Sequence, residues 1–555
     1  MKLPTEISGQ QSPTQKKSAA HKPPLAWLVP DLALAAAAVS LFYCLFFFQG
    51  YQRLFRDSDA GWHIRTGEAI LRSGELPRTD PYSSTRAGQP WFAWEWGTDV
   101  LAGAAHTAAG LGGVALLYGV VIAAGVWLWF RLHWAMGGNF LLACGMAPLL
   151  ITTCSLHWLA RPHVIGWLFL LAALGFFESA SRAAEGVFRG AERPSRPAQS
   201  PSRLGEGARP RFRARDAAAV AGGTVLWANM HASFFFAPLI ASIYAAGFAL
   251  RPLIWDLDRR TEWAKARWFL WAAAVSAIAG LLNPYGWRLY DHVARYVTDS
   301  ALLARVGEFQ SFDFHVAGAG QIILALAIGI GGGFLALGQK RPQHFLLAAL
   351  IFALALRSAR ALPLAALMLL PLANGAITEA LDHVRGLSPA FQDALDRFLA
   401  YSRRLRDIDL RFMGLAIVPL PVLVCLVLLK IPAIRDSTGF PREQFPVAAY
   451  PEVAKLPPSA RLFAPDKFGG YLIYRYNGSR KVFFDGRSDL YGAKFLKEYG
   501  EMVQLRPGWR ARWDSFRFTH ALAPNDFPLI PALEALGWTR IYRDGTATLL
   551  ANDEK

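Results

Sequence analysis

Residues 25–63 read LAWLVPDLALAAAAVSLFYCLFFFQGYQRLFRDSDAGWH, a long apolar run that ends in two acids. The apolar part, residues 25–48, exceeds the roughly 20 residues that a helix needs to cross a hydrocarbon core. It is also too long for the apolar region of a cleavable signal peptide. We therefore expect a signal anchor, with the polar residues 1–24 as a disordered tail in the cytoplasm.

The rest of the chain repeats this apolar pattern. Of its 555 residues, 53% are hydrophobic and 18% are charged, whereas a soluble protein carries about 25% charge. Residues 25–430 are therefore expected to form a membrane module of about eleven transmembrane helices. After the first run, the apolar blocks lie near residues 111–131, 140–157, 163–179, 216–231, 233–250, 268–283, 318–338, 344–357, 361–377 and 412–430.

The basic residues indicate the orientation. Counting from a cytoplasmic N-terminus places the segments 180–215, 251–267, 339–343 and 378–411 on the cytoplasmic side. Segment 180–215 holds nine Arg, as cytoplasmic loops do, and its Pro, Ser and Gly content predicts disorder. The outer segment 49–99 holds six Arg, so the asymmetry is incomplete. The net charge of +17 falls mostly in such loops, and without a basic-aromatic motif it does not indicate nucleic-acid binding.

A change of composition follows the last apolar block. Residues 431–555 contain short strand-like runs at 471–476 and 481–484, separated by Gly-Gly and Asn-Gly turn signals. About 120 residues suffice for one small domain. We expect a soluble α/β domain in the periplasm. Its run at residues 484–491 is either a β-turn fixed by Asp and Gly or a surface for a ligand.

The first outer loop, residues 49–99, carries the two acids Asp57 and Asp59 close to the end of the first helix. A carboxylate there can take a proton from an acceptor hydroxyl, or bind a divalent cation such as Mg²⁺ or Mn²⁺. The alternative is a solvated loop with an N-cap Asp. Residues 60–73 follow as an amphipathic helix suited to the membrane interface.

A further acid, Glu95, lies later in the same loop. The run 89–96 places three Trp around Glu95. Such a group is typical of an interfacial aromatic belt, with the Glu pointing to water. The other interpretation is that Glu95 binds the acceptor or takes part in acid–base chemistry.

This combination of topology, acids and interfacial helices resembles the GT-C superfamily of membrane glycosyltransferases, over roughly residues 25–375. The resemblance implies an α-helical polytopic fold whose first outer loop holds two interfacial helices and a catalytic acid. It implies Asp57 or Asp59 as the base of an inverting transfer. It also implies a sugar donor on a polyprenyl-phosphate carrier and a glycan, lipid or protein acceptor. The expected place is the outer face of a bacterial inner membrane, among membrane lipids.

Polar residues at the predicted outer helix ends are candidates for binding the substrate and its phosphate, because polar groups at membrane depth are usually functional. A metal at Asp57 and Asp59 is compatible with this pattern, and cationic side chains could take its place. Each candidate has a structural alternative: lipid-headgroup contact for Arg161, packing for His231, a helix stop for Asn283. The full set is His63, Trp96, Arg161, His163, His231, Asn283, Tyr285, Arg357 and Arg360.

Two other classes of function stay open. A transporter or flippase would show broken or charged helices near the bilayer midplane and two similar halves; neither is evident in the sequence. A non-catalytic membrane scaffold would keep its biological effect after both Asp57 and Asp59 are neutralised.

Overall fold

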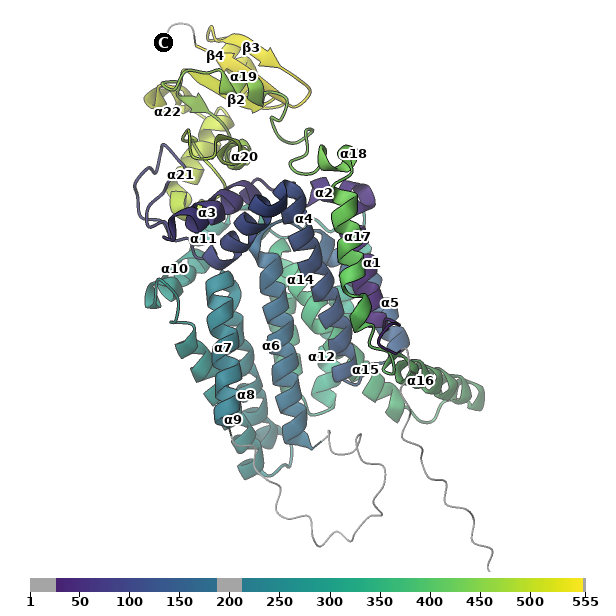
Figure 1. Ribbon diagram of the computed structural model, residues 1–555. Helices are drawn as coiled ribbons and strands as arrows, with labels where there is room; N and C mark the ends of the chain where they lie inside the picture. The colour runs from purple at the N-terminus through teal and green to yellow at the C-terminus, as the bar shows by residue number, and fades with distance from the viewer. Residues whose placement is uncertain (1–25, 187–211, 553–555) are drawn as a thin grey trace, which may run out of the picture.

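The protein is described here by a computed structural model that covers residues 26–186 and 212–552. Its helices run side by side in a long bundle, and a small domain with a β-sheet caps one end (Figure 1). The tail predicted at residues 1–24 and most of the loop predicted at 180–215 lie outside the described residues. At the ends of that loop, helix α6 (Pro162–Glu185) continues further than expected, and α7 (Ala214–Met230) begins earlier.

Within the described part of the chain, six helical segments are long and apolar enough to cross a membrane. Three shorter apolar helices accompany them: Phe140–Ser155, Pro342–Arg357 and Pro419–Leu429. The chain is thus a multi-pass membrane protein, and its count of about eleven spans stays a prediction. The six segments are Leu32–Arg53, Trp96–Ala135, Pro162–Glu185, Ala232–Ile254, Ala319–Gly338 and Ala359–His383.

The first helix leads directly to the acids. Helix α1 (Leu32–Phe46) starts at Asp31, whose carboxylate accepts the Leu34 N–H. It ends where Phe48 and Gln49 adopt the left-handed conformation, with φ of 48° and 55°. Two short turns, η1 (Phe47–Gln49) and α2 (Gly50–Arg53), then lead to helix α3 (Asp59–Ser73). The helix predicted at 60–73 is therefore present.

Helix α4 (Trp96–Ala135) consists of two parts, because Ala109 and Gly110 leave the helical conformation. Its first part packs against α3 at the capped end of the bundle, and its second part runs down the bundle (Figure 1). The first outer loop thus holds two helices, α3 and the start of α4.

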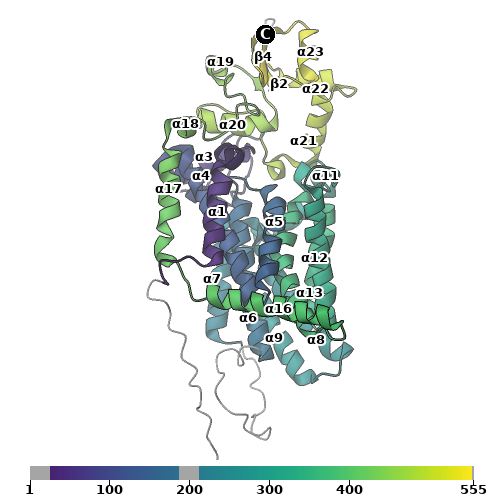
Figure 2. The same cartoon turned by 90° about the vertical axis from the view of Figure 1, so that its right-hand side faces the viewer.

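The remaining helices complete the bundle and its two ends. Helices α10 (Trp287–Thr298) and α11 (Ser300–Leu303) lie at the same end as α3 (Figure 1), and α16 (Pro389–Asp409) lies across the opposite end (Figure 2). The other helices of the bundle are α5 (Phe140–Ser155), α8 (Phe236–Ile254), α9 (Arg259–Ala279), α12 (Ala319–Gly338), α13 (Pro342–Arg357), α14 (Leu362–Leu364), α15 (Leu370–His383) and α17 (Pro419–Leu429).

The C-terminal domain is an α/β unit. Its four strands are β1 (Leu462–Phe463), β2 (His520–Pro524), β3 (Thr539–Arg543) and β4 (Ala547–Ala551). They form one sheet in the order β1-β2-β4-β3, in which only the β1–β2 pair is parallel. The helices that accompany the sheet are α19 (Tyr450–Ala454), α20 (Asp466–Tyr476), α21 (Ser488–Val503), α22 (Trp509–Phe516) and α23 (Leu529–Glu534).

Both strands predicted in the first part of this domain are wrong. Residues 471–476 belong to helix α20, in which Phe468, Leu472 and Tyr476 are buried at a spacing of four residues, the spacing of one helix face. Residues 481–484 form a loop, and Val482 makes a single bridge to Ser83 of the first outer loop. The structure of residues 481–484 therefore depends on contact with the first outer loop.

The C-terminal domain packs directly on the first outer loop. Helix α20 lies against α3, and the backbones come so close that a Cβ on Gly61 would lie 2.2 Å from the Gly470 carbonyl oxygen. Ser84 donates its N–H to the Val482 carbonyl at 2.8 Å. The domain therefore forms a lid over the end of the bundle where the acids lie.

Candidate active site

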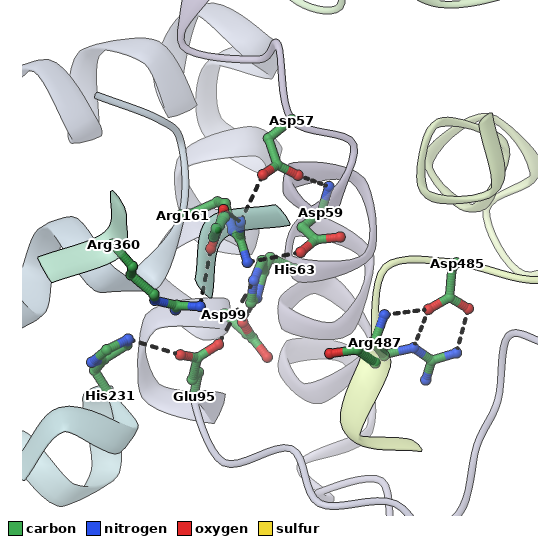
Figure 3. Close-up of polar contacts among 12 residues, drawn as sticks. Asp57, Asp59, His63, Glu95, Asp99, Arg161, His231, Arg360, Asp485 and Arg487 are labelled. Atoms are coloured by element: carbon green, nitrogen blue, oxygen red, sulfur yellow. Dashed lines mark hydrogen bonds and ion pairs between the residues drawn. The ribbon is translucent and has the colours of Figure 1, made fainter. Parts of the chain in front are cut away.

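Charged side chains from five separate segments meet under the C-terminal domain (Figure 3). They come from the first outer loop, the start of α6, the end of α7, the 284–317 loop and η6 (Ala359–Ala361). The structure brings Asp57, Asp59, Glu95, Arg161, His231 and Arg360 together at one end of the bundle.

Arg161 is the centre of the first group. It precedes Pro162 at the start of α6 and adopts extended backbone geometry. Its Nη1 lies 2.6 Å from Asp57 Oδ2 and 2.6 Å from Glu308 Oε1, and its Nη2 lies 2.9 Å from Asp59 Oδ2. Its side chain is only 15% exposed. Arg161 thus binds protein carboxylates rather than pointing to the surface.

Glu308 links two cations and was not among the predicted residues. It lies in η5 (Gly307–Phe309), and its second oxygen, Oε2, is 3.0 Å from Arg360 Nη1. Arg360 stays partly exposed, at 31%. Three other acids lie in the same loop, Asp291, Asp299 and Asp313, and nothing in the sequence separates Glu308 from them.

Glu95 belongs to a second group, which contains two histidines. His231 Nε2 lies 3.1 Å from Glu95 Oε1. Because His231 Nδ1 accepts the Ser233 N–H, the proton of the neutral ring is on Nε2, which donates to Glu95. Glu95 is 9% exposed. It does not point to water as the aromatic-belt interpretation expects, and its part in acceptor binding or acid–base chemistry stays a prediction.

His63 extends this group to a further acid, Asp99. His63 Nδ1 and Asp99 Oδ1 share a hydrogen bond of 2.6 Å, and His63 Nε2 faces Glu95 Oε2 at 3.8 Å. Among the described residues, neither His63 Nε2 nor Asp99 Oδ2 has a hydrogen-bond partner. Asp99 was missed, although its spacing of four residues from Glu95 places both acids on one side of the first turn of α4.

Burial sets the charge of these groups. Burial raises the pKa of Asp59 to about 8, with Arg161 acting against the shift and Asp57 adding to it. Burial likewise raises the pKa of Glu95 to about 7. For Glu308 burial is outweighed by Arg161 and Arg360, which hold its pKa well below the usual range. Burial therefore favours the protonated forms of Asp59 and Glu95, and the pKa of each lies close to the range in which general bases work best.

The other predicted residues mostly connect elements near the site. His163 Nε2 donates to the His157 carbonyl at 2.8 Å. Trp96 Nε1 donates to Asn229 Oδ1 at 3.1 Å, and the Tyr285 hydroxyl accepts the Ala93 N–H at 2.9 Å.

Two candidates are not joined to the charged group. Asn283 donates to the Gly280 and Gly286 carbonyls of its own turn, as the helix-stop alternative expects. Arg357 is exposed at the end of α13, and no ion pair joins it to the rest of the described chain.

The C-terminal domain supplies the roof of the site. Gly486 packs on Asp59: a Cβ added there would lie 2.1 Å from Asp59 Oδ1. On either side of it, Asp485 and Arg487 form a buried ion pair at 2.8 Å, and Asp489 lies 3.2 Å from His292 of α10. The run 484–491 is thus part of the site wall as well as a turn.

The acids do not fit a divalent metal in this arrangement. Arg161 lies between Asp57, Asp59 and Glu308, where a metal shared by these carboxylates would have to lie. In the chain as far as it is described, no group of three or more His, Cys, Asp or Glu side chains is arranged to hold a metal ion.

The fold of this chain is similar to that of a solved archaeal oligosaccharyltransferase. A similar solved structure is the archaeal oligosaccharyltransferase AglB from Archaeoglobus fulgidus, in complex with an inhibitory peptide and a dolichol-phosphate. It has a TM-score of 0.50 and 12% identity, over 89% of this chain and 69% of that chain. The apo form of the Archaeoglobus fulgidus oligosaccharyltransferase gives 0.46 and 13%, over 89% and 69%. No protein-family model and no curated protein matches the chain.

Proposed function

We propose that this chain is a membrane glycosyltransferase that moves a sugar from a polyprenyl-phosphate carrier to an acceptor. The observation that carries the proposal is the meeting of Asp57, Asp59 and Glu95 with Arg161 and Arg360 at one end of a GT-C fold. The lid formed by the C-terminal domain supports a reaction site rather than a plain surface.

Asp59 is the proposed general base. Its raised pKa of about 8 makes its ionised form a stronger base than an ordinary Asp carboxylate. Asp57 holds it in place, since Asp57 Oδ1 accepts the Asp59 N–H at 2.9 Å. With one base that activates the acceptor for direct attack on the sugar, the transfer inverts the anomeric carbon.

Arg360 is the proposed partner of the carrier phosphate. Glu308 Oε2 pairs with one nitrogen of the Arg360 guanidinium, Nη1. The Arg360 side chain nevertheless stays 31% exposed. A cation in place before the reaction stabilises the charge that develops on a departing phosphate. Arg161 is less available, because three carboxylates already surround it.

The substrates follow from the class. AglB was solved with a dolichol-phosphate and a peptide, which supports a polyprenyl-phosphate donor and a protein acceptor for this chain; glycan and lipid acceptors belong to the same proposal. We place the site on the outer face of a bacterial inner membrane, because the Arg-rich segment 180–215 follows the opposite end of α6.

The test uses the full-length protein in lipid nanodiscs, a panel of radiolabelled hexosyl and pentosyl polyprenyl phosphates, and membranes of the producing cell as the source of acceptors. The amount of radiolabelled sugar that moves from the lipid carrier to an acceptor measures transfer. We expect Asp59→Asn to lower the rate about 10²–10⁴-fold, the usual contribution of a general base. Asp57→Asn should lower it less, because its role is to position Asp59.

The matched control is Glu75→Gln, which neutralises an exposed acid of the same loop and should leave the rate unchanged. Transfer that persists in both Asp57→Asn and Asp59→Asn would contradict catalysis by these acids. The absence of transfer from every donor would contradict the proposed substrate class.

A further inference from the structure

Five of the six oxygens of the three clustered carboxylates have a hydrogen-bond or ion-pair partner in the chain itself. One oxygen of each, Asp57 Oδ2, Asp59 Oδ2 and Glu308 Oε1, contacts Arg161 at 2.6–2.9 Å. These distances are those of charge-assisted hydrogen bonds.

Two of the three second oxygens have partners as well. Asp57 Oδ1 accepts the Asp59 N–H at 2.9 Å, and Glu308 Oε2 pairs with Arg360 at 3.0 Å. Asp59 Oδ1 abuts the backbone of Gly486 so closely that no Cβ fits between them. An ion entering the cluster would have to displace a guanidinium or move the C-terminal domain.

The charges also balance without an ion. Two guanidiniums, Arg161 and Arg360, face the three carboxyl groups. Two of the three carboxylates balance the two guanidiniums one for one, so a single carboxyl group is left for any added cation. A divalent cation next to Arg161 would meet strong repulsion in this partly buried place, since the interaction of like charges grows as the dielectric constant falls.

We propose that Arg161 is a built-in cation that takes the place of a divalent metal among Asp57, Asp59 and Glu308, so that the site works without a bound metal. The guanidinium positions the three acids as a metal would, and it is carried permanently by α6. The statement about metal binding stands on the contacts alone. The statement about catalysis rests on the proposed glycosyltransferase function.

The experiment titrates Mn²⁺ into the purified full-length protein in nanodiscs and follows free Mn²⁺ by electron paramagnetic resonance. We expect the wild-type protein to show no one-equivalent site that depends on Asp59. Arg161→Met removes the cation and frees three carboxylates, so it should gain one Mn²⁺ with at least about tenfold higher affinity. The double variant Arg161→Met with Asp59→Asn should lose that gain.

Arg360→Met is the matched control, because it removes a neighbouring cation but leaves Arg161 among the acids; it should not gain the site. If Arg161→Met fails to fold, as judged by thermal melting, Arg161→Gln tests the same gain while keeping an N–H donor. A wild-type Mn²⁺ site that Asp59→Asn abolishes would overturn the proposal. So would a folded Arg161→Met or Arg161→Gln variant without any gain.

The statement that catalysis needs no bound metal is tested by a separate measurement. Where transfer is detected, its rate in excess EDTA should stay within about twofold of its rate with Mn²⁺, since an arginine cannot be chelated. A rate that EDTA abolishes and Mn²⁺ restores would overturn the metal-independent reaction. A failure to detect transfer concerns the donor and acceptor, and it leaves the Mn²⁺ titration as the test of Arg161.

Discussion

Arg487 of the C-terminal domain lies 2.8 Å from a carboxylate oxygen of Asp80 in the first outer loop, and both side chains are buried. Asp485 accepts two further hydrogen bonds from the same guanidinium. Arg487→Met would leave two buried carboxylates without their cation. We expect it to destabilise the folded state by about 3–5 kcal/mol, measured as a lower thermal melting midpoint in detergent.

The control for this effect is Arg512→Met in the same domain. Arg512 pairs with Glu501 at 3.0 Å, and both side chains are about one-third exposed or more. Such a pair contributes about 0–1 kcal/mol. Equal losses of melting temperature for Arg487→Met and Arg512→Met would contradict a special role for the buried pair.

Gly486→Ala tests whether the C-terminal domain shapes the site. The new Cβ would lie 2.1 Å from Asp59 Oδ1, so the loop or the acid has to move. We expect transfer to fall at least about tenfold, because small displacements of catalytic groups are costly. Gly545→Ala is the matched control: no atom lies within 4 Å of its added Cβ, and it should transfer at the wild-type rate.

Glu308→Gln tests the link between the two guanidiniums. The neutral amide weakens the ion pairs with Arg161 and Arg360, and Arg161 is then held by Asp57 and Asp59 alone. We expect a loss of about 10–100-fold in kcat/KM, in line with lost charge-assisted hydrogen bonds, measured with the labelled donor. Asp313→Asn, which neutralises an exposed acid of the same loop, should have no effect; equal losses in both variants would indicate a general charge effect.

The pH dependence of transfer tests Asp59 as the base. Burial raises its pKa to about 8, so below that pH the carboxyl holds a proton and cannot accept one. We expect kcat/KM to rise with pH from 6 to about 8 and to level off above, since the profile of kcat/KM reports groups of the free enzyme. The residual rate of Asp59→Asn should not follow this rise. A wild-type rate that falls between pH 6 and 8 would contradict the assignment.

The sequence contained enough to predict the helical bundle, because long apolar blocks have few other physical solutions. It also indicated the acids at the end of the first helix and the basic residues that face them, since both lie next to predicted helix ends. Glu308 and Asp99 were not found. Their roles depend on side chains 147 and 36 residues away, Arg161 and His63, and no local pattern marks such pairs.

The strand predictions at 471–476 and 481–484 were wrong for a related reason. Helix α20 is buried against α3, and Val482 bridges to Ser83, so contacts with the first outer loop override local turn signals. In the C-terminal domain only the α/β class could be predicted, because its first segments complete their packing on another part of the chain.

The lid has a consequence for how the protein is made. Ser84 and Val482, which join the loop to the lid, are 398 residues apart in the chain. A ribosome that adds about 5–20 residues per second needs roughly 20–80 seconds to cover that distance. Throughout that interval Gly486 has not yet been made. Asp59 and its loop therefore lack the residue that packs on them in the finished protein. The newborn chain therefore acquires this part of the site wall only after residues 482–486 have been made, and a chain that enters the membrane before then lacks it.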